Sequence, residues 1–199
     1  FYFQNLIQKN FNDLNDIVNI DDNTSYEISK EYINSLKKLS NNSKKVTDKL
    51  PINFKWIGLI KKILPNSTII HCQRNAKDTC LSIYKNYFTN PKLNFAYDLD
   101  DISIYYSEYR NLMNHWYKLL PDKIYNINYE KLVQEPKKEI KSLLNFCKLK
   151  FDKNCLDFSK NKRAIKTASD TQARKKVYKS SINLWKNYEK YLKTFYKTL

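Results

Sequence analysis

Glycine is almost absent from this chain: Gly58 is the single glycine in 199 residues. Loops that cradle a phosphate with backbone N–H groups usually need glycine for close approach, so no glycine-rich phosphate loop lies within these residues. Histidine is also scarce, with only His71 and His115, and the four cysteines include no C-x-x-C pair. Zinc-finger spacing is therefore excluded.

Long apolar runs are lacking as well. None approaches the roughly 20 residues that a membrane span requires, and no signal peptide is visible. Free cysteines and the absence of an export signal favour a cytoplasmic location. We expect Cys72, which lies in a strand-like run, to be a buried reduced thiol.

Apolar residues make up 42% of the chain and charged residues 28%, which argues against disorder. A chain of this size buries roughly 70% of its unfolded surface when it folds. No internal repeat or linker divides the sequence. We therefore expect a single domain over residues 1–199.

The formal net charge is +16. One interpretation is a polyanionic partner such as nucleic acid. The other is codon bias in an AT-rich genome, because Lys, Asn, Ile and Tyr are all abundant and the lysines are scattered along the chain. We favour a surface that attracts anionic ligands over a nucleic-acid-binding or membrane-binding function, and keep a basic nucleic-acid-binding module as an alternative.

Hydrophobic periodicity predicts an alternation of strands and helices. The expected strands are 68–72 and 123–128, with a short strand end at 45–49. The expected helices cover residues 1–10, 25–39, 54–63, 77–88, 100–120, 139–146 and 182–195. This alternation is typical of an α/β fold with a parallel sheet.

Ligands of such sheets bind at the carboxyl ends of the strands. The segments in those positions are Asp48-Lys49, Arg74-Asn75 and Tyr129-Glu130. Arg74 offers a bidentate fork to a phosphate, the helix that follows favours the same negative charge, and Ser82 adds a hydroxyl donor. The alternative is a salt bridge between Arg74 and Asp78, with Ser82 as an ordinary surface residue.

Four motifs occur in a distinctive order: VTDKLP at 46–51, TIIHCQRNAKDTCLS at 68–82, NYEKLV at 128–133, and TASDTQARKKVY at 167–178 with Trp185 and Tyr188 after it. Together they resemble the bacterial sulfotransferases related to protein-tyrosine sulfotransferases, which are often fused behind tetratricopeptide repeats. The resemblance implies a P-loop-like, three-layer α/β fold with a central parallel sheet and helices on both faces.

The resemblance also implies roles for individual residues. The donor would be 3′-phosphoadenosine 5′-phosphosulfate, with its 3′-phosphate held by Arg74 and Ser82 and its nucleotide beside Tyr129. The catalytic residues would be Lys49, at the transferring sulfonate and the bridging oxygen, and Ser169, which helps to hold that group. A basic residue near the 5′ end of the donor corresponds to Lys175, with Arg174 and Lys176 as adjacent candidates.

The acceptor implied by the resemblance is a hydroxyl group of a small molecule or a peptide, including peptidyl tyrosine. No metal is needed for this chemistry, because positioning and cationic groups stabilise the transition state. A homodimer is left open. A nucleotide-kinase-like enzyme is disfavoured because no Walker lysine is recognisable. A degenerate nucleotide-binding module without transferase activity stays a further alternative.

The sequence departs from the family at its front end. The family's phosphosulfate loop, typically Arg-Ser-Gly-Thr-Thr, and the glutamate base that follows it are not found, and Gly58 falls inside a predicted helix. We therefore hypothesise that the first strand, the loop and the base precede Phe1 in a longer gene, and that the chain as given is an impaired enzyme. A native start codon near Phe1 would contradict this hypothesis.

The remaining polar residues have structural explanations. We expect His71 and His115 to be structural histidines rather than general bases. Glu130 is expected at a helix start or paired with an arginine. Asp98, with Asp100 and Asp101, is expected to cap the long helix that follows.

Overall fold

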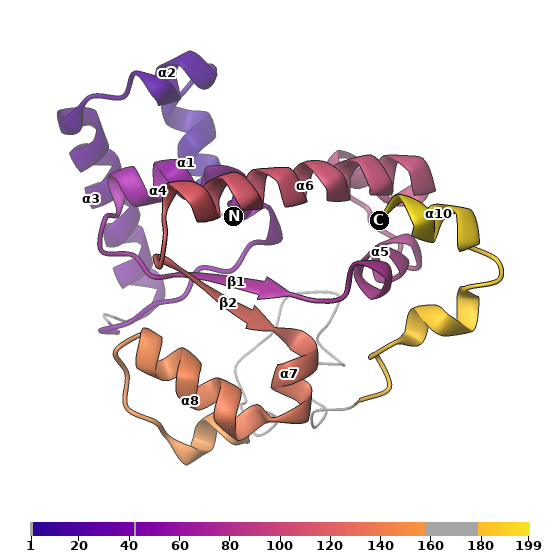
Figure 1. The fold of residues 1–199 in the computed structure, drawn as a ribbon. Coiled ribbons are helices and arrows are strands. Elements are labelled where there is room, and N and C mark those ends of the chain that lie inside the picture. The colour runs from indigo at the N-terminus through magenta and orange to yellow at the C-terminus, as the bar shows by residue number, and fades with distance from the viewer. Residues whose placement is uncertain (1, 42, 158–178) are drawn as a thin grey trace. The chain divides into compact units, whose positions relative to one another are not determined.

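The computed structural model describes residues 2–41, 43–157 and 179–199, in two compact units, Phe1–Ser67 and Thr68–Leu199. Figure 1 shows their elements, and each unit is described by itself. The expected single domain over residues 1–199 stays a prediction. No helix among the described residues is long and apolar enough to cross a membrane.

The first unit is helical. It contains α1 (Tyr2–Asn10), α2 (Leu14–Val18), α3 (Asp22–Leu39), the 3-10 helix η1 (Pro51–Trp56) and α4 (Ile57–Ile63). Ile28 and Tyr32 of α3 follow helical spacing and are buried in one cluster with Phe3 of α1 and Ile63 of α4. The helices predicted for 1–10 and 25–39 are therefore confirmed, and α3 starts earlier because Asp21 caps it by accepting from the Thr24 N–H.

Two predictions for this unit need correction. The strand end predicted for residues 45–49 is wrong, because this segment has no regular secondary structure. It is attached instead by a side-chain bond, from the Tyr32 hydroxyl to the Asp48 carboxylate at 2.6 Å. The helix predicted for 54–63 is α-helical only over Ile57–Ile63, since η1 begins at Pro51 and extends to Trp56.

The second unit contains a parallel pair of strands, β1 (Ile69–Gln73) and β2 (Ile124–Asn128), with His71 opposite Asn126 in the register. Both predicted strands are thus confirmed to within one residue. The other elements of this unit are α5 (Ala76–Tyr84), η2 (Pro91–Tyr97), α6 (Leu99–Leu119), α7 (Tyr129–Gln134), α8 (Pro136–Phe146), η3 (Lys153–Leu156), η5 (Leu184–Tyr188) and α10 (Lys193–Thr198).

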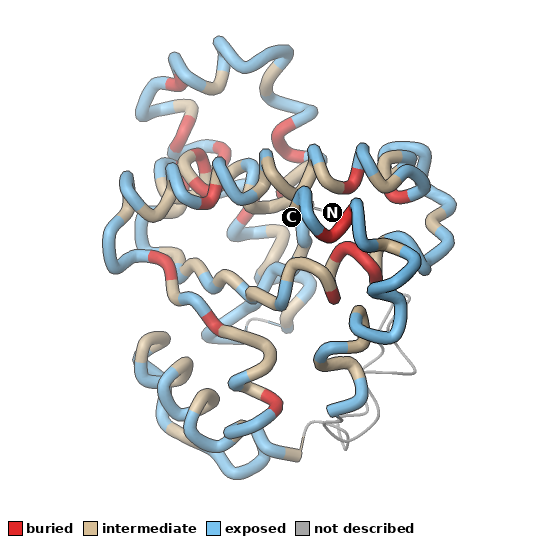
Figure 2. Tube along the Cα trace, turned by 45° about the vertical axis from the view of Figure 1, so that its right-hand side comes forward, coloured by how far each residue is buried: buried red, intermediate tan, exposed pale blue. Residues whose placement is uncertain are grey.

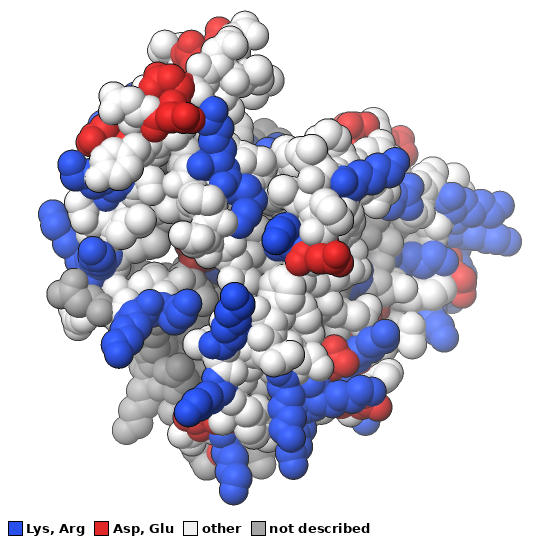
Figure 3. Space-filling view, turned by 60° about the vertical axis from the view of Figure 1, so that its left-hand side comes forward, with Lys and Arg blue, Asp and Glu red and all other residues white. Residues whose placement is uncertain are grey.

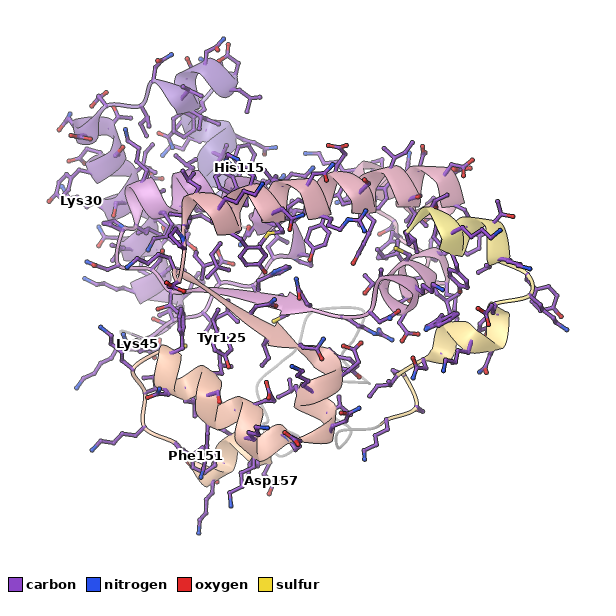
Figure 4. The ribbon with its side chains drawn as sticks, in the orientation of Figure 1. Lys30, Lys45, His115, Tyr125, Phe151 and Asp157 are labelled. Atoms are coloured by element: carbon purple, nitrogen blue, oxygen red, sulfur yellow. The ribbon has the colours of Figure 1, made fainter. Side chains whose placement is uncertain are left out.

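Helices contact this strand pair from opposite faces. His71 of β1 contacts Tyr109 on α6, whereas Tyr125 of β2 packs against Phe146 on α8 with ring centroids 5.0 Å apart. Figure 4 shows Tyr125 on the side of the strand pair that faces α8. Successive side chains of a strand alternate between faces, and Tyr125 shares a face with the residue next to His71. The α/β class is confirmed, while the full three-layer sheet stays a prediction because the described residues form two strands.

A core cluster of the second unit joins α5, α6 and α10, and Figure 2 colours the buried stretches of the chain red. Ile102 and Cys80 are almost fully buried and pack with Phe195 and Tyr196 of α10. The predicted N-cap is confirmed, because the Asp98 carboxylate accepts hydrogen bonds from the N–H groups of Asp100 and Asp101, the second and third residues of α6.

The predicted helix at 77–88 ends early, at Tyr84. The carbonyl of Ser82 accepts a bond from the Asn86 side chain, and both backbone groups of Phe88 bond to the Tyr97 hydroxyl. These bonds replace further helical turns.

The helix predicted for 182–195 is also wrong as one element, because it is divided into η5 and α10. Asn183 adopts a left-handed conformation with φ of 60°, and its N–H is bonded to a side chain elsewhere in the unit.

Cys72 is exposed, contrary to the expected burial. The helix on its face, α8, packs on β2 rather than β1, so this part of β1 remains open to solvent. Figure 3 shows Lys and Arg side chains spread over the visible face, with Asp and Glu among them. The view fits the scattered distribution of lysines along the sequence.

Candidate functional site at the carboxyl ends of the strands

The carboxyl ends of β1 and β2 meet at one edge because the strands are parallel. Arg74 follows β1 directly, and its guanidinium lies over the ring of Tyr129, the first residue of α7, at 5.2 Å from the ring centroid. The Asn75 N–H donates to the Glu130 carboxylate at 2.9 Å. Two of the three segments predicted at the strand ends, Arg74-Asn75 and Tyr129-Glu130, therefore contact each other, and Glu130 lies in the first turn of α7 as expected.

Arg74 has free donor capacity. One terminal nitrogen, Nη2, donates to the Ser181 carbonyl at 2.6 Å. Its Nε is buried, and nothing in the described part of the chain accepts a bond from it. A guanidinium carries five N–H donors in a planar fork that suits phosphate oxygens, so Arg74 can bind an anion here.

The salt bridge between Arg74 and Asp78, kept as an alternative at the level of sequence, does not form. The Asp78 carboxylate is 1% exposed, and its two oxygens accept from the N–H groups of Asn183 and Trp185 at 2.8 and 2.9 Å. Among the described residues no carboxylate pairs with Arg74, which supports its assignment as an anion ligand.

A cleft of about 470 Å³ adjoins Arg74. Its wall combines the end of β1, one face of α6, the start of α7 and residues 182–183. The lining is polar and aromatic, with amide, phenol, imidazole and guanidinium groups from Asn75, Asn128, Tyr106, Tyr109, His71 and Arg74. Such a lining can bind a polar ligand with a ring system.

The N-terminus of α5, the helix that follows Arg74, adds positive electrostatic potential at this edge. Asn75 caps α5 by accepting from the Asp78 N–H at 3.2 Å, so the positive end of the helix lies beside Arg74. Ser82 is half-buried on α5 and is not among the residues that line the cleft. Its joint action with Arg74 on one phosphate stays a prediction.

His71 lies between two phenols, with the Tyr117 hydroxyl at Nδ1 and the Tyr109 hydroxyl at Nε2. Burial lowers the pKa of His71 to about 4, so the imidazole is neutral at pH 7. Burial also raises the pKa of both Tyr109 and Tyr117. With each ring nitrogen engaged, His71 matches the structural role predicted for it.

The other predicted residues do not belong to the described part of the second unit. Lys49 is in the first unit, exposed, in the irregular segment between α3 and η1. Ser169 and Lys175 lie outside the described residues, as do Arg174 and Lys176. In the described ranges, no group of three His, Cys, Asp or Glu side chains could hold a metal ion.

Comparison with known proteins now adds a decisive observation. The model of the Sulfotransferase family matches residues 7–153, about three quarters of the chain. The chain belongs to the sulfotransferase family.

An uncharacterized protein of Aquifex aeolicus (strain VF5) is 38% identical to it over 178 residues. That alignment covers 88% of this chain and 23% of the relative, so this sulfotransferase-family chain spans about a quarter of the length of the curated relative it matches.

The family match includes Lys49, Arg74, Ser82 and Tyr129 and ends before the motif at 167–178. The kinship with protein-tyrosine sulfotransferases remains a prediction. Sequence reasoning missed the role of Asp78, because its position in the first turn of a helix suggests a local pair and contains no signal of a partner more than 100 residues away.

Proposed function

We propose that this chain forms the donor-binding part of a sulfotransferase, which transfers a sulfonate group from 3′-phosphoadenosine 5′-phosphosulfate to a hydroxyl acceptor. Membership of the family supports the reaction class. The observation that carries the proposal is Arg74, at the carboxyl ends of two parallel strands. Within residues 2–41, 43–157 and 179–199 it has no carboxylate partner, and its buried Nε has no acceptor.

The 3′-phosphate of the donor would bind at Arg74. The guanidinium fork pairs with two phosphate oxygens, and the N-terminus of α5 favours the same charge. The Tyr129 ring, which already faces the guanidinium, offers an aromatic surface to the adjoining nucleoside. Ser82 of α5 and Lys175 would complete the contacts to the donor, as the family resemblance implies.

The transfer itself is an in-line displacement at sulfur. A bond forms between sulfur and the acceptor oxygen while the bond from sulfur to the bridging oxygen breaks, and the electron pair leaves on adenosine 3′,5′-bisphosphate. The proton of the acceptor passes to a general base. Lys49 would donate a hydrogen bond to the bridging oxygen, and Ser169 would hold the sulfonate, so that both stabilise charge where it develops.

Peptidyl tyrosine is the acceptor that we favour within this proposal, because the motifs resemble those of protein-tyrosine sulfotransferases. The experiment on the donor does not depend on that choice.

Donor binding is tested by titrating the chain with adenosine 3′,5′-bisphosphate and with 5′-AMP while thermal unfolding is followed. A ligand that binds the folded state raises the melting temperature by mass action. We expect the bisphosphate to raise it more than 5′-AMP does, and Arg74→Ala to abolish the difference.

Lys123→Ala is the matched control, because it also removes one positive charge but lies before β2, at the opposite edge from Arg74. It should leave both shifts unchanged. Equal shifts with the two ligands in the wild type, or a bisphosphate shift that survives Arg74→Ala, would overturn the proposal.

A further inference from the structure

Asp78 makes an unusual pair of bonds. It is buried to 1% exposure in the first turn of α5, and each of its carboxylate oxygens accepts from a backbone N–H. Oδ2 bonds Asn183 at 2.8 Å and Oδ1 bonds Trp185 at 2.9 Å. A buried carboxylate is retained only where such bonds replace water, so both oxygens are committed to one segment distant in sequence.

A second contact holds the same segment on α5. The ammonium group of Lys77, the neighbour of Asp78, lies 4.0 Å from the centroid of the Trp185 ring. That ring in turn packs edge-on against Tyr196 of α10, with centroids 5.5 Å apart. Residues 183–185 are therefore attached to the start of α5 through the backbone by Asp78 and through the indole by Lys77.

The segment that Asp78 and Lys77 hold on α5 is also bonded to Arg74. Ser181, two residues before Asn183, provides the carbonyl that accepts from Arg74 Nη2 at 2.6 Å. Ile182 and Asn183 line the same cleft as the guanidinium. Asn183 has a left-handed backbone with φ of 60°. It lies between Trp185, which is also bonded to Asp78, and Ser181, which is bonded to Arg74.

We propose that Asp78 is a positioning residue of the donor site: through Asn183 and Ser181 it sets the orientation of the Arg74 guanidinium toward the 3′-phosphate. This inference rests on the proposed function. Asp78 is not among the residues that line the cleft, so it would act through these contacts and not by touching the donor. Its oxygens face backbone N–H groups at the start of a helix, which compensate its charge near the incoming anion.

The inference predicts a selective loss of affinity. Isothermal titration of Asp78→Ala should show adenosine 3′,5′-bisphosphate bound at least about tenfold more weakly than by the wild type, because a displaced guanidinium loses its geometry for phosphate. Affinity for 5′-AMP, which lacks the 3′-phosphate, should change less than about twofold. Asp78→Asn should be intermediate, because its amide oxygen still accepts one N–H.

Two controls separate positioning from a general loss of stability. Ile124→Ala removes a buried side chain at the far end of β2 without touching the segment, and it should lower the melting temperature while leaving both affinities unchanged. In an Arg74→Ala background, Asp78→Ala should cause no further loss of bisphosphate affinity, because the two residues act as one unit.

The outcomes distinguish the two proposals. If the wild type shows no preference for the bisphosphate, the proposed function fails and this inference fails with it. If the wild type prefers the bisphosphate and Asp78→Ala binds it equally well, the donor site stands and Asp78 has only a structural role. Additive losses in the double variant would also overturn the positioning role.

Discussion

The hydroxyl of Tyr32 on α3 donates a hydrogen bond to the carboxylate of Asp48 at 2.6 Å. Tyr32 is buried to 5% exposure in the core of the first unit, and the residue that it holds immediately precedes Lys49. The segment at 45–49, which was predicted to present the catalytic lysine, is thus attached to α3 by the side-chain hydrogen bond of Tyr32. It does not form a strand.

Tyr32→Phe should destabilise the first unit by roughly 1.5–3 kcal/mol, the usual range for a lost hydrogen bond to a charged group. Urea unfolding would measure the loss. Tyr26→Phe, on the same helix but 63% exposed, makes the same chemical change at a surface position and should alter stability by less than about 0.5 kcal/mol. Similar values for the two variants would contradict a stabilising bond to Asp48.

Two isoleucines on α6 provide a test of the core of the second unit. Ile102 is 1% exposed and Ile104 is 63% exposed. Ile102→Ala should cost about 2–5 kcal/mol in unfolding free energy, because a cavity remains where close-packed atoms were lost. Ile104→Ala should cost less than about 0.5 kcal/mol. Equal losses in chemical denaturation would mean that α6 presents a different face to the core.

The pH dependence of stability should reveal the lowered pKa of His71. Because burial lowers its pKa from 6.5 to about 4, the unfolded chain binds more protons than the folded chain between these values. The free energy of unfolding that neutral, buried His71 contributes is therefore complete above pH 6.5 and is lost as the pH falls toward 4. Thermal melts across this window should show a flatter dependence in His71→Gln than in the wild type.

His115→Gln is the control for that experiment. His115 is exposed on α6 beside Trp116, so this variant makes the same chemical change at an exposed position. If His71→Gln and the wild type lose stability in parallel on acidification, the contacts of His71 with the two tyrosines do not keep it neutral.

The N-cap of α6 can be tested by one substitution that lowers stability and a second at the same position that restores it. Asp98→Ala should reduce stability by about 1 kcal/mol, because two N–H groups at the helix start lose their acceptor. Asp98→Ser should restore most of it, since a serine hydroxyl can accept the same bonds. Thermal unfolding of the three chains side by side provides the comparison, and a serine variant as weak as the alanine variant would argue against capping.

Elements with a strong local pattern could be predicted from the sequence. The strand at 69–73 begins within the β-branched run Thr68-Ile69-Ile70, the strand at 124–128 begins with Ile124 and Tyr125, and α6 has a capping aspartate and a regular apolar stripe. The prediction that Arg74-Asn75 and Tyr129-Glu130 meet also followed, because parallel strands end at a common edge. These signals lie within single elements or follow from a general rule of parallel sheets.

The segments at 45–49 and 182–195 were predicted wrongly for a common reason. Each is held by a side chain from another element, Tyr32 in the first case and Asp78 in the second. Local propensity favoured a strand and a continuous helix, respectively. A hydrogen bond between residues 16 or 105 positions apart leaves no periodic trace in the sequence.

The sequence by itself determined the family and the two strands, and it singled out Arg74 as a candidate ligand for an anionic donor. Only the tertiary structure decided that Asp78 is bonded to Asn183 and Trp185 and does not form a salt bridge with Arg74. The physical reason is burial. A carboxylate in the first turn of a helix can pair locally or at a distance, and the choice depends on which backbone N–H groups the folded chain brings to it when water is removed.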